Sequence, residues 1–176
     1  AIVDEQGEPL PPRRVGEIVV RSDCMLTGYY RRDDLRPFHH GWYHTGDRGY
    51  LADGELYVIG RSKDLIINAG KNIYPQDIEA VVNEVPGVYP GRAVAFGVPD
   101  EREGTELIAV VAEVETADSE QQNQIRLVIR QRVVVETAVS VSFVTLVPRH
   151  WLRKTSSGKI ARAENRRKWL AERSTA

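Results

Sequence analysis

The distribution of hydrophobic positions divides the chain into two parts with different periodicities. Before residue 61 the apolar positions form short β-branched or alternating runs, such as residues 16–21, which are typical of strands. Asp53-Gly54 separates two apolar runs within residues 49–59, and this pair favours a type I′ hairpin turn because both turn positions need positive φ. The first part is therefore predicted to be rich in hairpins, with a loop at residues 8–12 and a polar, charged connector at residues 31–40.

A helical period appears after the junction. Residues 65–67 predict a short strand, which a glycine-containing turn then reverses. Pro75 suits the first turn of a helix, where its missing N–H costs nothing. One apolar face follows at helical spacing, made by Ile78, Val81, Val82 and Val85. Pro86-Gly87 ends this helix.

Two strands and a second helix come next. Residues 92–98 and 106–115 predict strands, separated by a turn-rich segment at residues 99–104. Ser119 and Gln122 have the spacing of a capping box, which predicts the start of a helix. The apolar side of that helix is Ile125, Val128, Ile129 and Val133.

The remaining segments complete an α+β pattern. Residues 139–147 predict another strand, residues 154–159 a loop, and a basic terminal helix begins at about Ile160. The order βαββαβ–loop–α predicts a small α+β domain with two helices on one face of a short sheet. We expect a small, mixed three-stranded sheet with flanking helices.

This pattern also predicts how the chain is divided. The strands of residues 1–60 have too little covering helix to enclose a core, so we expect the β-hairpin-rich end of a larger domain there. Residues 61–64 carry a charged cluster between apolar segments and predict a junction. Residues 65–176 form the second domain.

Composition places the chain among ordinary globular proteins, with 41% hydrophobic and 28% charged residues. The single cysteine, Cys24, gives neither an internal disulfide nor a metal or redox pair. No apolar run approaches the roughly 20 residues of a membrane-spanning helix. The first residues lack a signal-peptide core, so a cytoplasmic location without a membrane span is the expectation.

The net charge of −1 hides an asymmetry. Residues 149–173 contain nine basic and two acidic residues and carry +7, which leaves −8 for the rest of the chain. A basic end on an acidic body suggests an anionic ligand. A nucleotide, a phosphopantetheine group and nucleic acid all satisfy this observation.

Three charged residues stand out around the junction. Asp47 ends a Thr-Gly-Asp motif, where it either bonds nearby backbone N–H groups in a turn or accepts both hydroxyls of a ribose. Arg61 has an alternative reading as a surface partner of Asp64 in a weak ion pair. Lys63 beside Asp64 would then be a solvated charge pair.

Lys159 closes the motif Lys-Thr-Ser-Ser-Gly-Lys. The motif is not a phosphate-binding GxxxxGK[ST] loop, because Arg153 replaces the first glycine and Ile160 the final Ser/Thr. A flexible Ser/Gly loop can still carry a lysine into a site made elsewhere, and a plain basic surface loop is the alternative. The histidines His39, His40 and His44 lack ligand spacing, so no metal site is predicted.

Four motifs in this order resemble the adenylate-forming acyl-activating (AMP-binding) superfamily. They are Tyr-His-Thr-Gly-Asp (43–47), Gly-Arg-Ser-Lys-Asp (60–64), Gly-Lys-Asn-Ile-Tyr-Pro-Gln-Asp-Ile-Glu (70–79) and Lys-Thr-Ser-Ser-Gly-Lys (154–159). The resemblance covers essentially the whole chain. The segment Tyr-Pro-Gln-Asp-Ile-Glu (74–79) is most similar to the fatty acyl-AMP ligase branch.

The resemblance implies a role for each motif. Asp47 would hold the ribose hydroxyls of ATP with help from Arg61, and Lys63 would be the hinge about which a mobile C-terminal lid, residues 65–176, swings. Lys159 would be the catalytic lysine that bridges the substrate carboxylate and the nucleotide during adenylation. The loop of Gly70, Lys71 and Asn72 would line the path of the pantetheine thiol.

The resemblance further implies a ligase. The superfamily's glycine-rich phosphate loop, its acid for Mg²⁺ and its acyl pocket match no segment here. ATP and Mg²⁺ would therefore be bound mainly by another domain, and this chain would be a C-terminal fragment that is inactive alone. The full enzyme would make acyl-AMP from a carboxylic acid, expected to be a fatty acid.

The acceptor of the acyl group stays open between two pantetheine thiols. One is the phosphopantetheine of an acyl carrier protein, and the other is free CoA, as in acyl-CoA synthetases. The fatty acyl-AMP ligase branch usually carries an Arg-Gly-Arg-Asn-His type of loop, whereas residues 69–73 are Ala-Gly-Lys-Asn-Ile. A rival from another class is a small nucleic-acid-binding module using the basic helix, which lacks interleaved stacking aromatics.

Overall fold

The computed structural model describes residues 1–32, 34, 37–100, 102 and 104–174. Two compact units make up the chain, Ala1–Lys63 and Asp64–Ala176, and we call them the first and the second unit.

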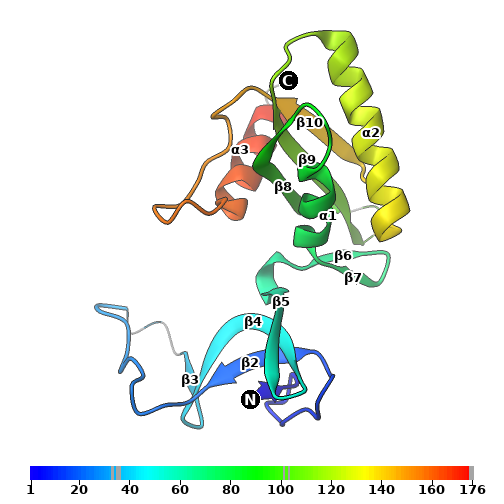
Figure 1. The fold of residues 1–176 in the computed structure, drawn as a ribbon. Helices are drawn as coiled ribbons and strands as arrows, with labels where there is room; N and C mark the ends of the chain where they lie inside the picture. The colour runs from blue at the N-terminus through cyan, green and yellow to red at the C-terminus, as the bar shows by residue number, and fades with distance from the viewer. Residues whose placement is uncertain (33, 35–36, 101, 103, 175–176) are drawn as a thin grey trace. The chain divides into compact units, whose positions relative to one another are not determined.

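The first unit is an antiparallel sheet in which β4 is the longest strand. Its sheet order is β1-β2-β4-β3, and β5 also pairs with β4 (Figure 1). The strands are β1 Ile2–Val3, β2 Gly16–Val20, β3 Phe38–His39, β4 Trp42–Ala52 and β5 Glu55–Arg61.

The predicted hairpin is confirmed at Asp53-Gly54. The two residues have φ of 53° and 83°, and they join β4 to β5 with Ala52 opposite Glu55. The connector predicted at residues 31–40 contains a short strand, because Phe38–His39 forms β3 against β4. Such a two-residue strand depends on its partner strand and leaves no periodic signal in the sequence. Residues 33, 35 and 36 of this range lie outside the described part of the chain.

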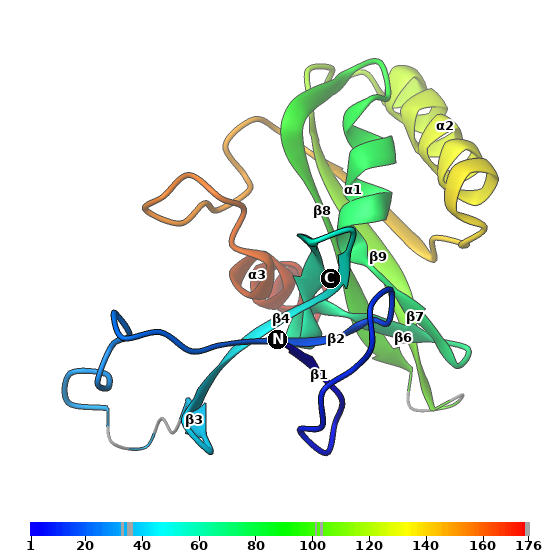
Figure 2. The same ribbon diagram turned by 60° about the horizontal axis from the view of Figure 1, so that its bottom comes forward.

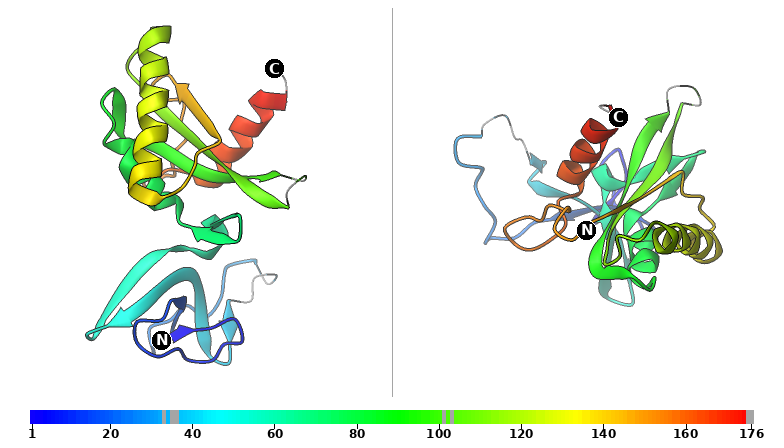
Figure 3. Two further views of the ribbon diagram at one scale, coloured as in Figure 1. Left: turned by 90° about the vertical axis from the view of Figure 1, so that its right-hand side faces the viewer. Right: turned by 90° about the horizontal axis from the view of Figure 1, so that it is seen from above.

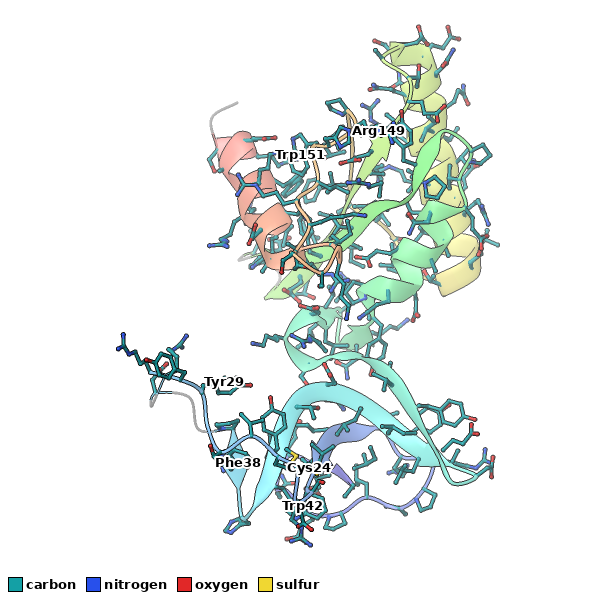
Figure 4. All side chains as sticks on the ribbon, turned by 60° about the vertical axis from the view of Figure 1, so that its left-hand side comes forward. Cys24, Tyr29, Phe38, Trp42, Arg149 and Trp151 are labelled. Atoms are coloured by element: carbon teal, nitrogen blue, oxygen red, sulfur yellow. The ribbon has the colours of Figure 1, made fainter. Side chains whose placement is uncertain are left out.

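Few apolar side chains of the first unit are buried. Ile2, Val3, Ile18, Val19 and Ala52 are the buried hydrophobic residues among its described positions. On the hairpin, Leu56, Tyr57 and Val58 of β5 are exposed. Figure 4 shows the labelled aromatic residues Phe38 and Trp42 at the other end of this sheet.

The second unit begins with small elements. A 3-10 turn, η1 (Ser62–Asp64), crosses the boundary between the units. The hairpin of β6 (Ile66–Asn68) and β7 (Lys71–Ile73) follows, and α1 (Pro75–Asn83) begins at the predicted proline. The short strand predicted at residues 65–67 is therefore shifted by one residue and has a partner, β7.

A mixed three-stranded sheet forms the centre of the second unit, as predicted. Its order is β10-β9-β8, with β10 parallel and β8 antiparallel to β9. The strands are β8 Val88–Asp100, β9 Thr105–Val114 and β10 Phe143–Val147. The helix α2, Ser119–Thr137, precedes β10, and α3, Arg162–Ser174, follows it.

Helices cover both faces of this sheet (Figures 1 and 3). Alternate residues of β9 point to opposite faces, as strand geometry requires. Ile108 and Val110 pack into the core under α1 and α2, whereas Ala109 and Val111 pack with Trp169 of α3. The prediction of two helices on one face is confirmed for α1 and α2, and α3 lies on the other face.

Two helix starts differ from the prediction. The side chain of Asp118, not Ser119, caps α2, with its Oδ1 accepting the backbone N–H of Gln121 at 2.8 Å. The terminal helix begins at Arg162 because Ile160 still pairs with Lys154 in an isolated β-bridge. No helix in the described part of the chain is long and apolar enough to cross a membrane.

Candidate functional site

Asp47 lies on β4, at a bend that its neighbours Thr45 and Gly46 form. Thr45 donates from Oγ1 to the carbonyl of Ile18 on β2 at 2.7 Å, and the same oxygen accepts the backbone N–H of Asp47 at 3.0 Å. Gly46, between them, has a φ of 72°, which favours glycine. The Thr-Gly-Asp sequence therefore holds the backbone from which the Asp47 side chain extends, through the hydrogen bond between Thr45 Oγ1 and the N–H of Asp47.

Arg61 stands opposite Asp47 at the end of β5. The two residues are register partners, and Arg61 Nε donates to Asp47 Oδ1 at 3.1 Å. The side chains are 61% and 35% exposed, so the pair contributes little stability and stays open to a ligand. Asp64, the alternative partner suggested by the sequence, forms an ion pair with Arg162.

Glu17 on β2 supports this turn, and sequence reasoning missed it. Its Oε1 accepts the backbone N–H of Gly46 at 3.1 Å, and its Oε2 lies 2.9 Å from Nδ1 of His44. A carboxylate in the otherwise apolar run Gly-Glu-Ile-Val-Val (16–20) was the available signal. Pairing of β2 with β4 gives this acid its role.

An open hollow of about 440 Å³ adjoins the turn within the first unit. Its lining includes Tyr29, Tyr43, Arg61 and Lys63. The hydroxyls of Tyr29 and Tyr43 lie 2.8 Å apart, and this hydrogen bond raises the pKa of Tyr43 above its ordinary value. The hollow thus offers hydroxyl and cationic groups to a polar ligand.

Lys63 is exposed in η1, and its amine has no hydrogen-bond or ion-pair partner among the described residues. Its hinge role stays a prediction. Among the described residues, no group of three or more His, Cys, Asp or Glu side chains could hold a metal ion.

Gly70, Lys71 and Asn72 form the exposed end of the β6–β7 hairpin. Ala69 and Gly70 have φ of 48° and 74°, so this turn again places two residues at positive φ. Side chains of β9 hold the hairpin: Glu106 accepts the backbone N–H of Ile67 at 2.8 Å. The loop is thus presented on a fixed base.

A second contact holds the turn itself. Thr105 Oγ1 accepts the backbone N–H of Ala69 at 2.8 Å. Because the base is fixed at two points, the exposed residues of the turn keep their direction. Their role toward a thiol stays a prediction.

Lys159 is exposed on the loop between β10 and α3, which projects from the sheet in Figure 2. Thr155 closes this loop: its backbone N–H donates to the carbonyl of Lys159 at 2.8 Å, and its Oγ1 accepts the backbone N–H of Lys159 at 3.2 Å. The amine itself has no partner in the described part of the chain. It is free to reach a ligand.

Buried polar groups hold the base of this lysine loop, which we define as residues 153–161. Asn165 is fully buried, accepts the backbone N–H of Arg153 at 2.8 Å and donates to the carbonyls of Arg153 and Ala161 at 2.9 and 3.0 Å. Glu113, also fully buried, accepts the backbone N–H of Leu152 at 2.7 Å.

An aromatic contact adds to this base. The amine of Lys168 lies 3.8 Å from the ring centre of Trp151, which Figure 4 labels beside Arg149. The same amine donates to the backbone carbonyl of Trp151 at 2.9 Å. The two ends of the loop are therefore fixed while its tip is exposed.

The structure brings Asp47 and Arg61 together in the first unit. Lys159 and the turn at Gly70 belong to different loops of the second unit. Part of the charge of the basic segment is neutralised within the second unit, since Arg162 forms ion pairs with Asp64 and Glu79. This reduces the charge that the segment presents to an external anion.

Curated relatives match most of the chain, although no family model matches it. A probable long-chain-fatty-acid–AMP ligase, FadD30 from Mycobacterium tuberculosis, is 38% identical over an alignment of 175 residues, and the match covers 88% of this chain and 29% of that protein. Oxalate–CoA ligase from Arabidopsis thaliana is 37% identical over an alignment of 166 residues, and the match covers 92% of this chain and 31% of that protein. The chain thus spans about three tenths of these relatives.

Solved structures match the fold. McyG A-PCP complexed with phenylalanyl-adenylate gives a TM-score of 0.87 at 32% identity, over 97% of this chain and 27% of that one. A structure from a study of fatty acyl-adenylate ligases of E. coli and L. pneumophila gives 0.85 at 36% identity, over 99% and 31%.

A third structure contains nucleotide and metal. O-succinylbenzoate CoA synthetase from Bacillus subtilis in complex with ATP and magnesium gives a TM-score of 0.71 at 26% identity, over 94% of this chain and 33% of that one. The resemblance found in the sequence is confirmed by these matches. The chain therefore matches the C-terminal part of the AMP-binding, adenylate-forming superfamily of ligases.

Proposed function

We propose that this chain is the C-terminal portion of an ATP-dependent ligase that converts a carboxylic acid into an acyl-adenylate and transfers the acyl group to a thiol. The observation that carries the proposal is the formed pair of Asp47 and Arg61, in a chain that matches such ligases over nearly its full length. The proposal concerns the complete protein, of which the relatives' lengths make this chain a fraction.

Asp47 and Arg61 would bind the ribose of ATP. The carboxylate of Asp47 uses one oxygen for Arg61, and further acceptor capacity is open to two hydroxyl donors. Hydrogen bonds to a charged partner contribute about 1.5–3 kcal/mol each. The carboxylate of Asp47 and the guanidinium of Arg61 fit the hydroxyls of a ribose. The described residues offer no carboxylate cluster for Mg²⁺.

Lys159 would act on the reaction itself. When a substrate carboxylate attacks the α-phosphate, negative charge gathers where two anions meet. A lysine amine placed there offsets this repulsion most strongly in the transition state, which raises the rate instead of merely tightening binding. The unpartnered amine on a loop with a fixed base suits this role.

The two units suggest how one lysine is used in one half-reaction only. We propose that Lys63 is the hinge, with the second unit moving as a lid after adenylation. The turn of Gly70, Lys71 and Asn72 would then approach the pantetheine thiol. Positive φ at Ala69 and Gly70 and the hydrogen bonds of this hairpin to β9 hold the turn in a fixed conformation.

We propose a fatty acid as substrate and the phosphopantetheine of a carrier protein as acceptor. FadD30 and the fatty acyl-adenylate ligase structure support the fatty acid. The similarity of residues 74–79 to the fatty acyl-AMP ligase branch is the ground for the carrier protein. CoA is the alternative acceptor, supported by the nearly equal identity of the oxalate–CoA ligase. Comparing the rates at which free CoA and a carrier protein consume acyl-adenylate in the complete enzyme separates the two.

Replacement of Lys159 tests the central role. In the complete enzyme, Lys159→Ala should reduce acyl-adenylate formation by about a hundredfold or more, the size seen when one charge-stabilising group is lost. Pyrophosphate exchange measures this rate, and Lys154→Ala on the same loop is the matched control. Unchanged adenylation in Lys159→Ala would contradict the proposal.

The fragment itself gives a second measurement. The isolated 176-residue chain should show no ATP–pyrophosphate exchange. Clear turnover by this chain would refute its assignment as one part of a larger active site.

A further inference from the structure

Arg162 lies at the first position of α3, three residues after Lys159, and it joins three other segments of the second unit. Its two terminal nitrogens bond different carboxylates: Nη1 donates to Asp64, and Nη2 donates to both oxygens of Glu79 at 2.9 and 3.0 Å. The Arg162 side chain is 16% exposed, so these contacts are shielded from water. Shielded, charge-assisted bonds hold their geometry better than surface pairs do.

The third contact is to the sheet. Arg162 Nε donates to the carbonyl of Ala95 on β8 at 3.0 Å, and Glu79 accepts the backbone N–H of Ala95 at 2.8 Å. Arg162 and Glu79 thus bond the carbonyl and the backbone N–H, respectively, of the same residue of β8, Ala95. The start of α3 is fixed relative to the sheet by this arrangement.

Asp64 connects this cluster to η1. It ends η1 and directly follows Lys63, the proposed hinge, and its side chain is 25% exposed. The backbone that leaves the first unit is therefore connected, through a single ion pair, to the residue that begins α3.

The path from Arg162 to Lys159 is short and constrained. Ala161 donates its backbone N–H to the carbonyl of Arg153, Ile160 pairs with Lys154, and Thr155 closes the loop on Lys159. A displacement of Arg162 would therefore be passed along backbone hydrogen bonds to the lysine.

We propose that Arg162 is a positioning residue that ties the lysine loop to the turn at the unit boundary through Asp64. The inference rests on the proposed function of Lys159. The position of the Lys159 amine is then fixed relative to the backbone that follows Lys63. A change at the boundary would alter the place of the amine, and a displacement of about 1 Å can reduce a reaction rate by about a hundredfold.

The test uses Asp64→Asn in the complete enzyme. This variant keeps the shape of the side chain and leaves the bonds of Arg162 to Glu79 and Ala95 in place, so folding is preserved. We expect kcat for adenylation to fall by about tenfold, with KM for ATP unchanged because Asp47 is untouched. Arg162→Lys, which keeps the charge but loses the forked geometry, should cause a similar or larger loss.

A double-mutant cycle separates positioning from general stability. In a Lys159→Ala background, Asp64→Asn should have no further effect on adenylation, since the amine it positions is gone. Glu120→Gln, which removes an exposed acid from the first turn of α2, is the matched control and should leave both backgrounds unchanged.

Two results would overturn the inference. One is an equal loss from Asp64→Asn in both backgrounds, which would mean that the ion pair acts on the fold and not on the lysine. The other is an unchanged rate in Asp64→Asn while Lys159→Ala is slow. If Lys159→Ala itself adenylates normally, the proposed function fails first, and this result is distinguishable from the other two.

Discussion

The two units of this chain solve the problem of burying apolar surface in different ways. The second unit packs hydrophobic residues on both faces of its sheet, including fully buried Ile108 and Val111. The described part of the first unit buries few hydrophobic side chains, among them Ile18 and Val19, and its hairpin exposes Leu56 and Val58. An independent core suits a unit that moves as one body, whereas an open sheet depends on other protein surface.

The proposed chemistry follows the same division. The first unit holds Asp47 and Arg61 in strands, where they can bind a nucleotide. The second unit carries Lys159 on a projecting loop, where it can contribute to the rate. Binding and rate are thus assigned to different units, and this comparison can be tested.

The largest expected difference is in folding. Expressed separately, residues 64–176 should unfold cooperatively in urea, because two hydrophobic clusters enclose the sheet. Residues 1–63 alone should show no cooperative transition, since a small open sheet buries too little apolar area. Circular dichroism during urea titration measures both. A cooperative transition in residues 1–63 would break the comparison.

The next difference is kinetic. In the complete enzyme, Asp47→Asn should raise KM for ATP by roughly tenfold to a hundredfold, from the loss of one charge-assisted hydrogen bond of about 1.5–3 kcal/mol. Lys159→Ala should instead lower kcat with little change in KM. Steady-state pyrophosphate exchange over a range of ATP concentrations measures both parameters. The same profile in the two variants would contradict the division of roles.

The smallest effect is a pH dependence within the second unit. Burial raises the pKa of Glu79 above its ordinary value of 4.5, and Arg162 offsets this in part. The folded unit then retains a proton that the unfolded chain has released. Its free energy of unfolding should therefore fall as pH rises from 4.5 through the raised pKa.

Glu79→Gln removes this titration. The free energy of unfolding of the native protein, relative to that of the variant, should decrease as pH rises. Urea unfolding of both proteins at several values between pH 4 and pH 7 measures the difference. Parallel pH profiles would show that Glu79 does not carry the dependence.

The sequence predicted those features that depend on local chemistry. Asp53-Gly54 specified the hairpin turn, and Pro75 with the apolar face of Ile78 and Val82 specified α1. The mixed sheet and its flanking helices followed from the order of elements. The hinge and catalytic roles of Lys63 and Lys159 stay predictions.

Features that arise from packing were not predictable in the same way. Strand β3 has two residues, and only its pairing with β4 defines it. Asn165 looks like a polar residue on a basic helix, yet it is fully buried against the base of the lysine loop. Glu17 contacts His44 and Gly46, which lie 27 and 29 positions further along the chain.

The arginines of α3 have a further consequence for β8, the outer strand of the mixed sheet. Arg162 and Arg166 occupy the carbonyls of Ala95 and Gly97, which lie two residues apart along this strand. A bare strand edge invites another chain to add to it, and charged side chains that cover it prevent such aggregation. The side chains of α3 therefore protect this edge of the second unit from pairing with the strands of neighbouring molecules.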